Sequence, residues 1–387
     1  MKITSIDTVI VHAEMRNWVF VKVSTDEGLV GWGESTVEWK TRAVVGCIED
    51  YRTLLVGEDP RRVEHIWQMM YRQHFFRPGM VECSAMSGIE HACWDIAGKA
   101  LGAPVHQLLG GAVRDTVRLY DHLGGGEMLS VYHTLSAEEA REKIRESLEL
   151  GFDAIKLEVV IPRTGRVDGI EALRHADRVM AAVREEAGDG VELMVDMHGR
   201  CSPMMAAQYF TVLEPYRPWF FEEPCPPEHP RSMAELARRT TVPIATGERL
   251  CTRHPFRELL ELGACSVLQP DAVHCGGISE LRRIAAMGEA YHAALAPHSS
   301  TGPIGHAASM HVAFATPNFL IQETWRADVP WRFDVLSQTL PFEGSTAQLP
   351  TAPGLGIDVD EKEAAKHPFQ QEPLMRYFHP DGSVADW

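Results

Sequence analysis

Six acidic or histidine residues each follow a short apolar segment in the second half of this 387-residue chain. They are Asp196, Glu222, Glu248, Asp271, His298 and Glu323, separated by 26, 26, 23, 27 and 25 residues. Such near-constant spacing predicts that each of them ends a strand in a repeating strand–helix unit. Because the carboxyl ends of parallel strands in a closed barrel meet at one mouth, we expect all six side chains to converge there.

Three of these residues are carboxylates on consecutive predicted strands. Asp196, Glu222 and Glu248 would repel one another and lose hydration if they converged without a counter-charge. A divalent cation between them would offset this cost, and carboxylate oxygens suit Mg²⁺ better than Zn²⁺. The sequence therefore predicts one Mg²⁺ per chain, with these three residues as its ligands.

Two histidines stand beside these acids. His198 lies two residues after Asp196, so on an extended segment it points the same way. It could take part in chemistry, serve as a fourth ligand, or be a hydrogen-bonded core residue. His298 has Asp271 one strand before it, in position for an aspartate–histidine dyad. Because a carboxylate fixes the tautomer and raises the basicity of the ring, His298 is the stronger candidate for a general base.

Two further charged residues end predicted strands. Lys156 stands in the run Ile155-Lys-Leu-Glu158, where it could neutralise a bound carboxylate or form an ordinary surface ion pair. Glu323 could hydrogen-bond a substrate oxygen if it is protonated, or it could add a negative charge behind the site.

Eight short apolar segments must position these residues, and most of the stretches between them have helical periodicity. The predicted strands are Val117–Tyr120, Ala154–Leu157, Val191–Val195, Trp219–Phe221, Pro243–Ala245, Ser266–Leu268, Ala293–Ala296 and Phe319–Ile321. The helical stretches include Ala137–Leu150, Gly169–Glu186 and Ser279–His292. Apolar strands alternating with helices indicate a parallel sheet covered on both faces, and eight units fit a (β/α)8-type barrel. An open doubly wound sheet is disfavoured, because Gly124–Gly126 is too short for a dinucleotide-binding motif.

The two ends of the chain have a different rhythm. Val19–Val23 alternates in polarity, Asp26–Gly28 signals a turn, and Leu29–Gly33 follows, which predicts a meander. A helix is expected over Ala85–Leu101, ended by Gly102 and Pro104. Its predicted apolar face consists of Met86, Ile89, Ala92, Cys93, Ile96, Ala97 and Ala100. The aromatic tail is expected to pack on this N-terminal unit. We therefore expect an α+β domain over residues 1–115, a barrel over 116–325, and a segment completing the first domain over 326–387.

Composition excludes several classes of function. With 37 Lys and Arg against 54 Asp and Glu, the formal net charge is -17, which argues against nucleic-acid and anionic membrane partners. The 8 cysteines form no CxxC pair and are expected to be reduced packing residues. No apolar run approaches the roughly 20 residues that span a bilayer, and the N-terminus does not resemble a signal peptide. The chain is expected to be cytoplasmic.

The motifs that surround these residues resemble the enolase superfamily, in its mandelate racemase branch, and most closely the galactonate dehydratases. The resemblance covers nearly the whole chain and is carried by Val195–Arg200, Phe221–Pro224, Gly247–Arg249, Gln269–Asp271, Ala296–His298 and Gln322–Glu323. Asp26–Glu34 resembles the hairpin of the capping domain, and Ala92–Asp95 and Leu108–Gly111 resemble the segment that leads into the barrel.

The resemblance implies an α/β fold, a (β/α)7β TIM-like barrel with an α+β capping domain built from both terminal segments. It implies a carbon–oxygen lyase that dehydrates a galactonate-like sugar acid to a 2-keto-3-deoxy acid through an ene-diolate, with Mg²⁺. His298 would then take the α-proton and His198 would protonate the departing hydroxyl. Lys156 and Glu323 would hold the ene-diolate oxygens. Relatives of this kind are homo-oligomers that act on small molecules.

Two capping segments and one departure bear on the substrate. Met15–Trp18 and Phe75–Pro78 are expected to cover the site, with Arg16, Trp18 and Arg77 as substrate contacts. Racemases that use a lysine base carry a second lysine where this chain has Glu158. Galactonate dehydratases tend to have asparagine there, so Glu158 weakens the assignment of galactonate itself.

Three other functions stay open. A racemase, epimerase or cycloisomerase on the same scaffold could use one histidine on each face of the site. A metal-dependent hydrolase would need a His-x-His pair on the first strand, and Asp121-His122 is not that pair. A catalytically degenerate binding or regulatory protein would be expected to have lost some of the site residues, and none is missing.

Overall fold

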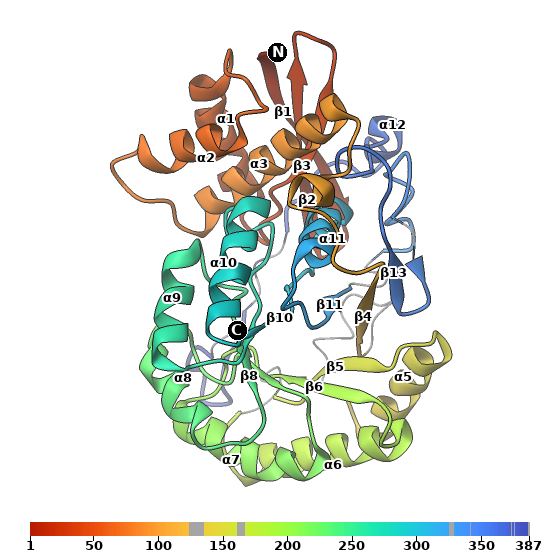
Figure 1. Ribbon diagram of the computed structural model, residues 1–387. Coiled ribbons are helices and arrows are strands. Elements are labelled where there is room, and N and C mark those ends of the chain that lie inside the picture. The colour runs from red at the N-terminus through yellow and green to blue at the C-terminus, as the bar shows by residue number, and fades with distance from the viewer. Residues whose placement is uncertain are drawn as a thin grey trace.

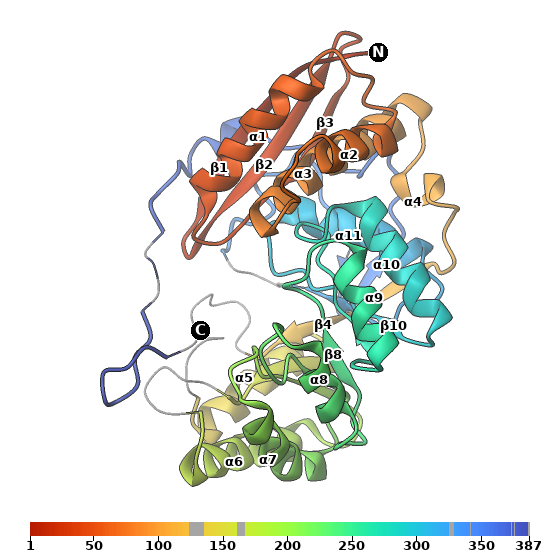
Figure 2. The ribbon, with the colours of Figure 1, turned by 90° about the vertical axis from the view of Figure 1, so that its left-hand side faces the viewer.

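The computed structural model consists of a small α+β unit stacked on a barrel (Figures 1 and 2). It describes residues 1–123, 135–160, 167–324, 329–340, 342–372, 374 and 376–385. Gly124–Gly126, the run considered and rejected above as a dinucleotide-binding loop, lies outside these ranges.

The N-terminal unit opens with the predicted meander. Three antiparallel strands, β1 (Ile3–Ala13), β2 (Arg16–Thr25) and β3 (Val30–Glu34), pair in the order β1–β2–β3. Gly28 makes the second turn with a φ of +82°, a conformation that glycine adopts without strain. Four helices follow, α1 (Thr41–Leu55), α2 (Val63–Arg72), α3 (Met80–Leu101) and α4 (Val105–Leu108).

Helix α3 lies directly on strand β3. A Cβ at Gly33 would lie 1.8 Å from the carbonyl oxygen of Gly88, and one at Gly31 would lie 2.1 Å from that of Ala92. The two elements can approach this closely only because glycine occupies both strand positions. The predicted apolar face of α3 is buried apart from Ala100, which is exposed near the Gly102 C-cap at the end of the helix.

The barrel contains eight parallel strands and seven helices within the described residues. The strands are β4 (Thr116–His122), β5 (Ala154–Glu158), β6 (Glu192–Asp196), β7 (Phe221–Glu222), β8 (Ile244–Thr246), β9 (Val267–Leu268), β10 (Ala294–Leu295) and β11 (Gln322–Glu323). The helices are α5 (Ala137–Glu149), α6 (Ile170–Ala187), α7 (Pro203–Leu213), α8 (Pro230–Ala237), α9 (Arg253–Leu262), α10 (Ile278–Ala290) and α11 (Pro303–Ala315). A 3-10 turn, η2 (Glu214–Tyr216), follows α7.

The sheet closes on itself. Strands β4 to β10 pair in sequence order, and β11 pairs in parallel with β4. On the other side, Phe319 forms a parallel bridge with Leu295 of β10, so the segment before β11 joins the two ends of the sheet. This is the predicted (β/α)7β barrel, in which the last strand has no helix after it. The eighth strand was predicted over Phe319–Ile321, directly before the observed β11. The apolar residues that suggested the strand precede the polar residues Gln322 and Glu323, which form the ladder with β4.

The C-terminal segment returns to the N-terminal unit. A hairpin of β12 (Phe342–Glu343) and β13 (Thr346–Gln348) adds to the outer edge of β4, and α12 (Glu361–Ala364) follows. The backbone N–H of His12 donates to the carbonyl of His367 at 2.8 Å, and the N–H of Asn17 donates to Glu372 at 3.0 Å. Trp331 stacks on His367 with 3.5 Å between ring centroids. The tail therefore packs on β1 and β2 of the N-terminal unit, as we expected.

The structure bears on two features considered from composition, the cysteines and the membrane-spanning helices. All eight cysteines lie in the described ranges and are free thiols. Among the helices described, none combines the length and the apolarity that crossing a bilayer requires.

Candidate active site

A ring of polar side chains lies one layer above the apolar filling of the barrel. The filling takes one residue from each strand or from its flank: Tyr120, Ala154, Met194, Phe220, Ala245, Val267, Ala296 and Ile321. Side chains two residues apart on a strand face the same way. The next layer toward the carboxyl ends is therefore His122, Lys156, Asp196, Glu222, Gly247, Gln269, His298 and Glu323.

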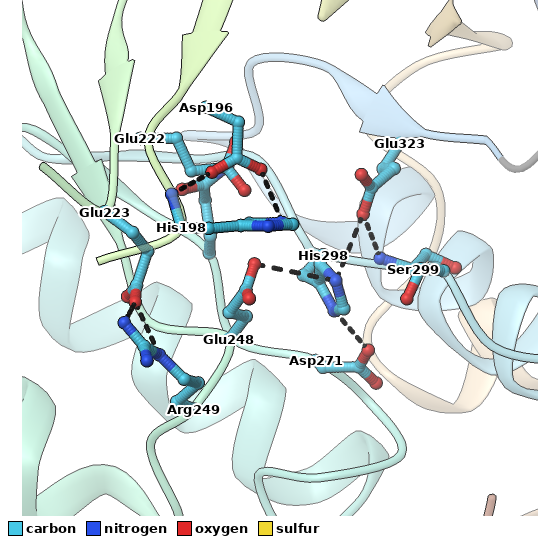
Figure 3. A network of polar contacts seen from close by, with 12 residues as sticks. Asp196, His198, Glu222, Glu223, Glu248, Arg249, Asp271, His298, Ser299 and Glu323 are labelled. Carbon is cyan, nitrogen blue, oxygen red and sulfur yellow. Dashed lines mark hydrogen bonds and ion pairs between the residues drawn. The ribbon is translucent and has the colours of Figure 1, made fainter. Parts of the chain in front are cut away.

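Two predicted residues, Glu248 and Asp271, lie outside the two-residue register of this ring and reach the site from turns. The chain turns at Gly247, where φ is +141° and a Cβ would lie 2.5 Å from the ring of Phe256. Both features require glycine at this position. The turn brings Glu248, one residue later, into the site. Asp271 follows β9 by three residues and approaches from beside His298 (Figure 3).

The three predicted metal ligands come together. Asp196, Glu222 and Glu248 each offer a carboxylate oxygen within 4.8 Å of the other two. Asp196 Oδ2 and Glu248 Oε2 are buried and have no hydrogen-bond partner among the described residues. Oxygens that bind Mg²⁺ side by side lie about 2.9 Å apart, so modest side-chain movement would bring these three into its coordination shell. Charged neighbours lie 3.2–3.6 Å from Asp196 Oδ2 and Glu248 Oε2 but make no hydrogen bond to them. The all-oxygen donor set and these free acceptor positions fit a hard divalent cation.

Electrostatics point the same way. Burial and the neighbouring Asp196 charge raise the pKa of the Glu222 carboxyl well above its usual range, although Lys156 acts against this. The raised pKa means that the positive charge around Glu222 is too small to offset its burial and its acidic neighbours. A cation in this position would supply that charge.

Lys156 is buried among carboxylates and does not form a surface ion pair. Its ammonium lies 2.7 Å from Glu222 Oε1, 2.9 Å from Glu323 Oε1 and 3.2 Å from Asp196 Oδ2. Burial disfavours the charge, but these carboxylates outweigh burial and hold the pKa of Lys156 well above its usual range. The lysine is therefore a fixed positive charge at the centre of the site.

His298 and Asp271 form the predicted dyad. Nδ1 of His298 lies 2.6 Å from Asp271 Oδ2, while Nε2 faces Glu248 at 3.6 Å and Glu323 at 3.8 Å. Burial lowers the pKa of His298, but Glu248, Glu323 and Asp271 together raise it well above its usual value when no metal is bound. A cation held by Glu248 would offset the largest of these contributions and favour the neutral ring that a base requires. A dyad bonded through Nδ1 leaves Nε2 directed into the site, which is the geometry a proton-transferring histidine needs.

His198 approaches from the opposite side, so both rings point into the space beside Glu248 (Figure 3). Its Nε2 lies 3.3 Å from Asp196 Oδ2, and its Nδ1 lies 3.5 Å from Glu158 Oε2. The residue has a φ of +48°, in the left-handed region, and its N–H donates to Asp196 Oδ1 at 2.9 Å. Strained backbone held in this way is typical of functional positions.

Glu323 lies among positively charged groups and contacts His122, a histidine that was not predicted from the sequence. Burial acts against its charge, but Lys156, His298 and His122 hold the pKa of Glu323 well below its usual range. His122 Nε2 lies 2.6 Å from Glu323 Oε1. The alternative of a protonated Glu323 is therefore not the one that the structure favours. His122 follows the first predicted strand as the other site residues follow theirs, so the same rule could have found it.

Two other supporting contacts were also missed. Gln269 donates to Glu222 Oε2 at 2.7 Å and belongs to the ring described above. Glu223, with a φ of +42°, turns its side chain away from Glu222 and accepts from Arg249 Nε at 2.7 Å. Both contacts restrain residues beside the predicted metal ligands.

The loop that carries His298 is held by three charged side chains from outside the barrel. Arg16 donates to the carbonyl of Ser300 at 2.5 Å, and Arg332 donates to that of Thr301 at 2.8 Å. Glu34, at the end of β3, accepts from the N–H groups of Gly302 and Gly305 at 2.6 and 2.7 Å. It thus caps the N-terminus of α11 with a buried carboxylate.

Glu34→Gln should lower both the stability and the turnover of the enzyme. The amide would turn N–H groups toward backbone N–H donors, which costs about 1–3 kcal/mol for each buried group left unpaired. We expect the loop of His298 to shift and kcat to fall about tenfold, because small displacements of a catalytic group are costly. Thermal unfolding and initial rates measure the two effects. Glu14→Gln removes an exposed carboxylate from the turn between β1 and β2 of the same sheet and should change neither; equal effects would contradict the role of Glu34.

The other predicted capping contacts are placed differently. Trp18 is fully buried and packs on Trp331, with ring centroids 5.5 Å apart, and under Arg332. Arg16 is also fully buried and pairs with Glu38 at 2.6 Å. Arg77 donates to the carbonyl of Tyr71, in the last turn of α2, and to that of His74 in its own loop. Arg16 reaches the site through the loop of His298, while substrate contact by any of the three residues stays a prediction.

Comparisons with known proteins cover both parts of the chain. Residues 3–110 match the family described as "Mandelate racemase / muconate lactonizing enzyme, N-terminal domain", and residues 139–363 match "Enolase C-terminal domain-like". The D-galactonate dehydratase of Ralstonia nicotianae (strain ATCC BAA-1114 / GMI1000) is 40% identical over 400 residues, covering 100% of both chains.

Solved structures agree with this similarity. A mandelate racemase/muconate lactonizing enzyme-like protein from Roseovarius sp. TM1035 has a TM-score of 0.91 at 33% identity, with 100% of both chains covered. An enolase from Agrobacterium radiobacter, a candidate galactarate dehydratase with bound sodium and L-malate, has a TM-score of 0.90 at 31% identity, again with 100% of both chains covered.

Proposed function

Because the chain belongs to the mandelate racemase/muconate lactonizing enzyme family of the enolase superfamily, we propose that it is a hydro-lyase that dehydrates a sugar acid. The substrate class is an aldonate resembling galactonate, and the product is the 2-keto-3-deoxy acid. The full-length similarity to D-galactonate dehydratase supports this reaction class. Glu158 leaves the stereochemistry of the sugar acid open.

One observation carries the proposal. Two histidines, His198 and His298, follow β6 and β10, which are four strands apart in the barrel. Their Nε2 atoms lie 3.3 Å from Asp196 and 3.6 Å from Glu248, so each contacts a different carboxylate of the acidic triad, and Lys156 lies 3.2 Å from Asp196. Dehydration needs a base for the proton on C2 and an acid for the hydroxyl on C3. A site with a separate histidine for each transfer can perform both.

Asp196, Glu222 and Glu248 are the residues that would hold Mg²⁺. When bound, Mg²⁺ would supply Lewis-acid stabilisation of the negative charge that develops on the substrate carboxylate. Lys156 adds a fixed positive charge to the same place. Its surroundings keep it protonated, so it acts by charge and not as a base.

The proton transfers then follow from the two histidines. Nε2 of His298, oriented by Asp271, takes the proton from C2, and the electron pair passes into the carboxylate to give an ene-diolate. As the pair returns, the C3–O bond breaks and His198 donates a proton, so the hydroxyl leaves as water. The enol product becomes the 2-keto-3-deoxy acid by tautomerisation. Glu323, held by Lys156 and His122, contributes a negative charge beside the ene-diolate and fixes the positions of these two cationic or hydrogen-bonding neighbours.

A racemase or epimerase is the second candidate, and the same pair of histidines favours it. A proton removed from C2 by His298 could be replaced on the opposite face by His198. The two reactions differ in whether the C3 hydroxyl is lost.

A screen of mono- and diacid sugars with Mg²⁺ in D₂O tests the proposed reaction. We expect at least one aldonate to give a product that reacts with semicarbazide, which detects the new keto group. Deuterium at C2 without loss of the C3 hydroxyl would establish epimerisation and overturn dehydration. A metal-loaded protein that binds sugar acids with neither reaction would instead indicate a degenerate binding protein.

A further inference from the structure

Glu158, the residue that departs from the related enzymes, is neither exposed nor isolated. It ends β5 directly opposite Asp196 of β6 in the parallel register. Its side chain is only 3% exposed, and its Oε2 accepts from Arg200 Nη1 at 2.7 Å. Arg200 is itself 4% exposed and also donates to the carbonyl of Val160 at 2.9 Å. The negative charge of Glu158 is therefore neutralised inside the protein.

The same carboxylate faces His198. Nδ1 of His198 lies 3.5 Å from Glu158 Oε2, and that ring is 16% exposed. A substrate in the barrel mouth would thus meet His198, whereas Glu158 lies behind it. The separation is longer than a normal hydrogen bond, but catalytic hydrogen bonds are often long in ligand-free structures and tighten on binding.

We propose that Glu158 and Arg200 are positioning residues for His198. Glu158 accepts the proton on Nδ1 and so directs Nε2 toward the substrate, while Arg200 fixes the carboxylate in place. The barrel mouth then contains two carboxylate–histidine pairs, Glu158–His198 and Asp271–His298, one on each side of the acidic triad. This inference rests on the proposed dehydration only where it predicts the rate of elimination; the orientation of His198 does not depend on it.

The inference also removes a difficulty with the substrate. A free carboxylate at position 158 would repel a sugar acid. Paired with Arg200 and screened by His198, Glu158 adds no net charge to the pocket. Glu158 thus determines the orientation of the acid catalyst and does not select against anionic substrates.

Glu158→Gln tests the proposal by separating two rates. Arg200 and His198 both contact Oε2 of Glu158. The amide oxygen of glutamine can still bind Arg200, but without the negative charge it is a weaker acceptor for the proton on Nδ1 of His198. We expect elimination to slow about 10–100-fold, the usual cost of losing a residue that orients a catalytic histidine. KM and the rate of C2 proton exchange should stay within about twofold, because binding and His298 are untouched. Glu149→Gln, at an exposed position on α5, is the matched charge control.

A structural readout makes the test independent of turnover. Long-range ¹H–¹⁵N spectra of the Mg²⁺-loaded protein, with the signal of His198 assigned by its loss in His198→Asn, report which ring nitrogen carries the proton. We expect Nδ1 protonation in the parent protein and a mixed tautomer in Glu158→Gln. Unchanged spectra, or exchange and elimination that fall equally, would overturn the positioning role. If the parent dehydrates no sugar acid, the proposed function fails, and the spectra still decide the inference.

Discussion

His298→Asn should abolish both C2 proton exchange and dehydration, with a fall of about 10²–10⁴-fold, the usual contribution of a general base. Asparagine is close to histidine in size but has no basic nitrogen. The proton on C2 of a carboxylate is very weakly acidic, so no other step can compensate for the missing base. Exchange measured by NMR in D₂O reports proton removal alone, and semicarbazide reports the complete reaction.

His198→Asn is the matched comparison for this prediction, because the same substitution is made on the opposite side of the site. It should abolish elimination yet allow exchange, since His298 and its Asp271 partner at 2.6 Å remain. Normal exchange in His298→Asn would show that the base has been assigned to the wrong residue. If both variants lose both reactions equally, the two histidines act as one unit and the division of roles fails.

The ring of site residues could be predicted because a strand has a simple period. Every second residue of a strand faces the same way, so polar residues two positions beyond the apolar barrel filling must line the mouth. Asp196 and Lys156 obey this rule directly. His122 and Gln269 obey it too, since they lie two residues beyond Tyr120 and Val267 of the apolar filling.

Glu248 and Asp271 were found by the same spacing, although they approach the site from turns and not from strands. Glu248 enters because Gly247 turns the chain, and Asp271 enters three residues after its strand. Their distance from the strand ends varies, so the spacing placed them at the mouth of the barrel but did not indicate the turns that carry them.

Contacts between distant segments lay beyond prediction. Nothing local to Glu34 indicates that it caps α11, about 270 residues later in the chain. The pairing of Glu158 with Arg200 was equally hidden, because it depends on the neighbouring strand and on the turn after Asp196. These pairings are set by tertiary packing, whereas the predicted strands and helices are set by local sequence.

Removal of Mg²⁺ should abolish activity and also reduce stability, and the second effect separates the metal site from general folding. Three carboxylates within 4.8 Å of one another destabilise the metal-free protein. Bound metal stabilises the folded state by RT ln(1 + [L]/Kd), or about 2.7 kcal/mol at a hundredfold excess over Kd. Thermal unfolding after chelation, and again after Mg²⁺ is restored, should show a reversible rise in Tm with metal.

Glu248→Gln provides the decisive variant. Glu248 is the most exposed of the three carboxylates, at 15%, and its Oε2 makes no hydrogen bond in the described residues. The substitution removes a repelling charge, so the metal-free variant should be at least as stable as the metal-free parent. It also removes a metal ligand, so the rise in Tm with Mg²⁺ should shrink or vanish. Glu149→Gln should retain the full rise. An undiminished rise in Glu248→Gln would place the cation elsewhere, whereas a less stable metal-free variant would show that Glu248 stabilises the fold by contacts unrelated to metal.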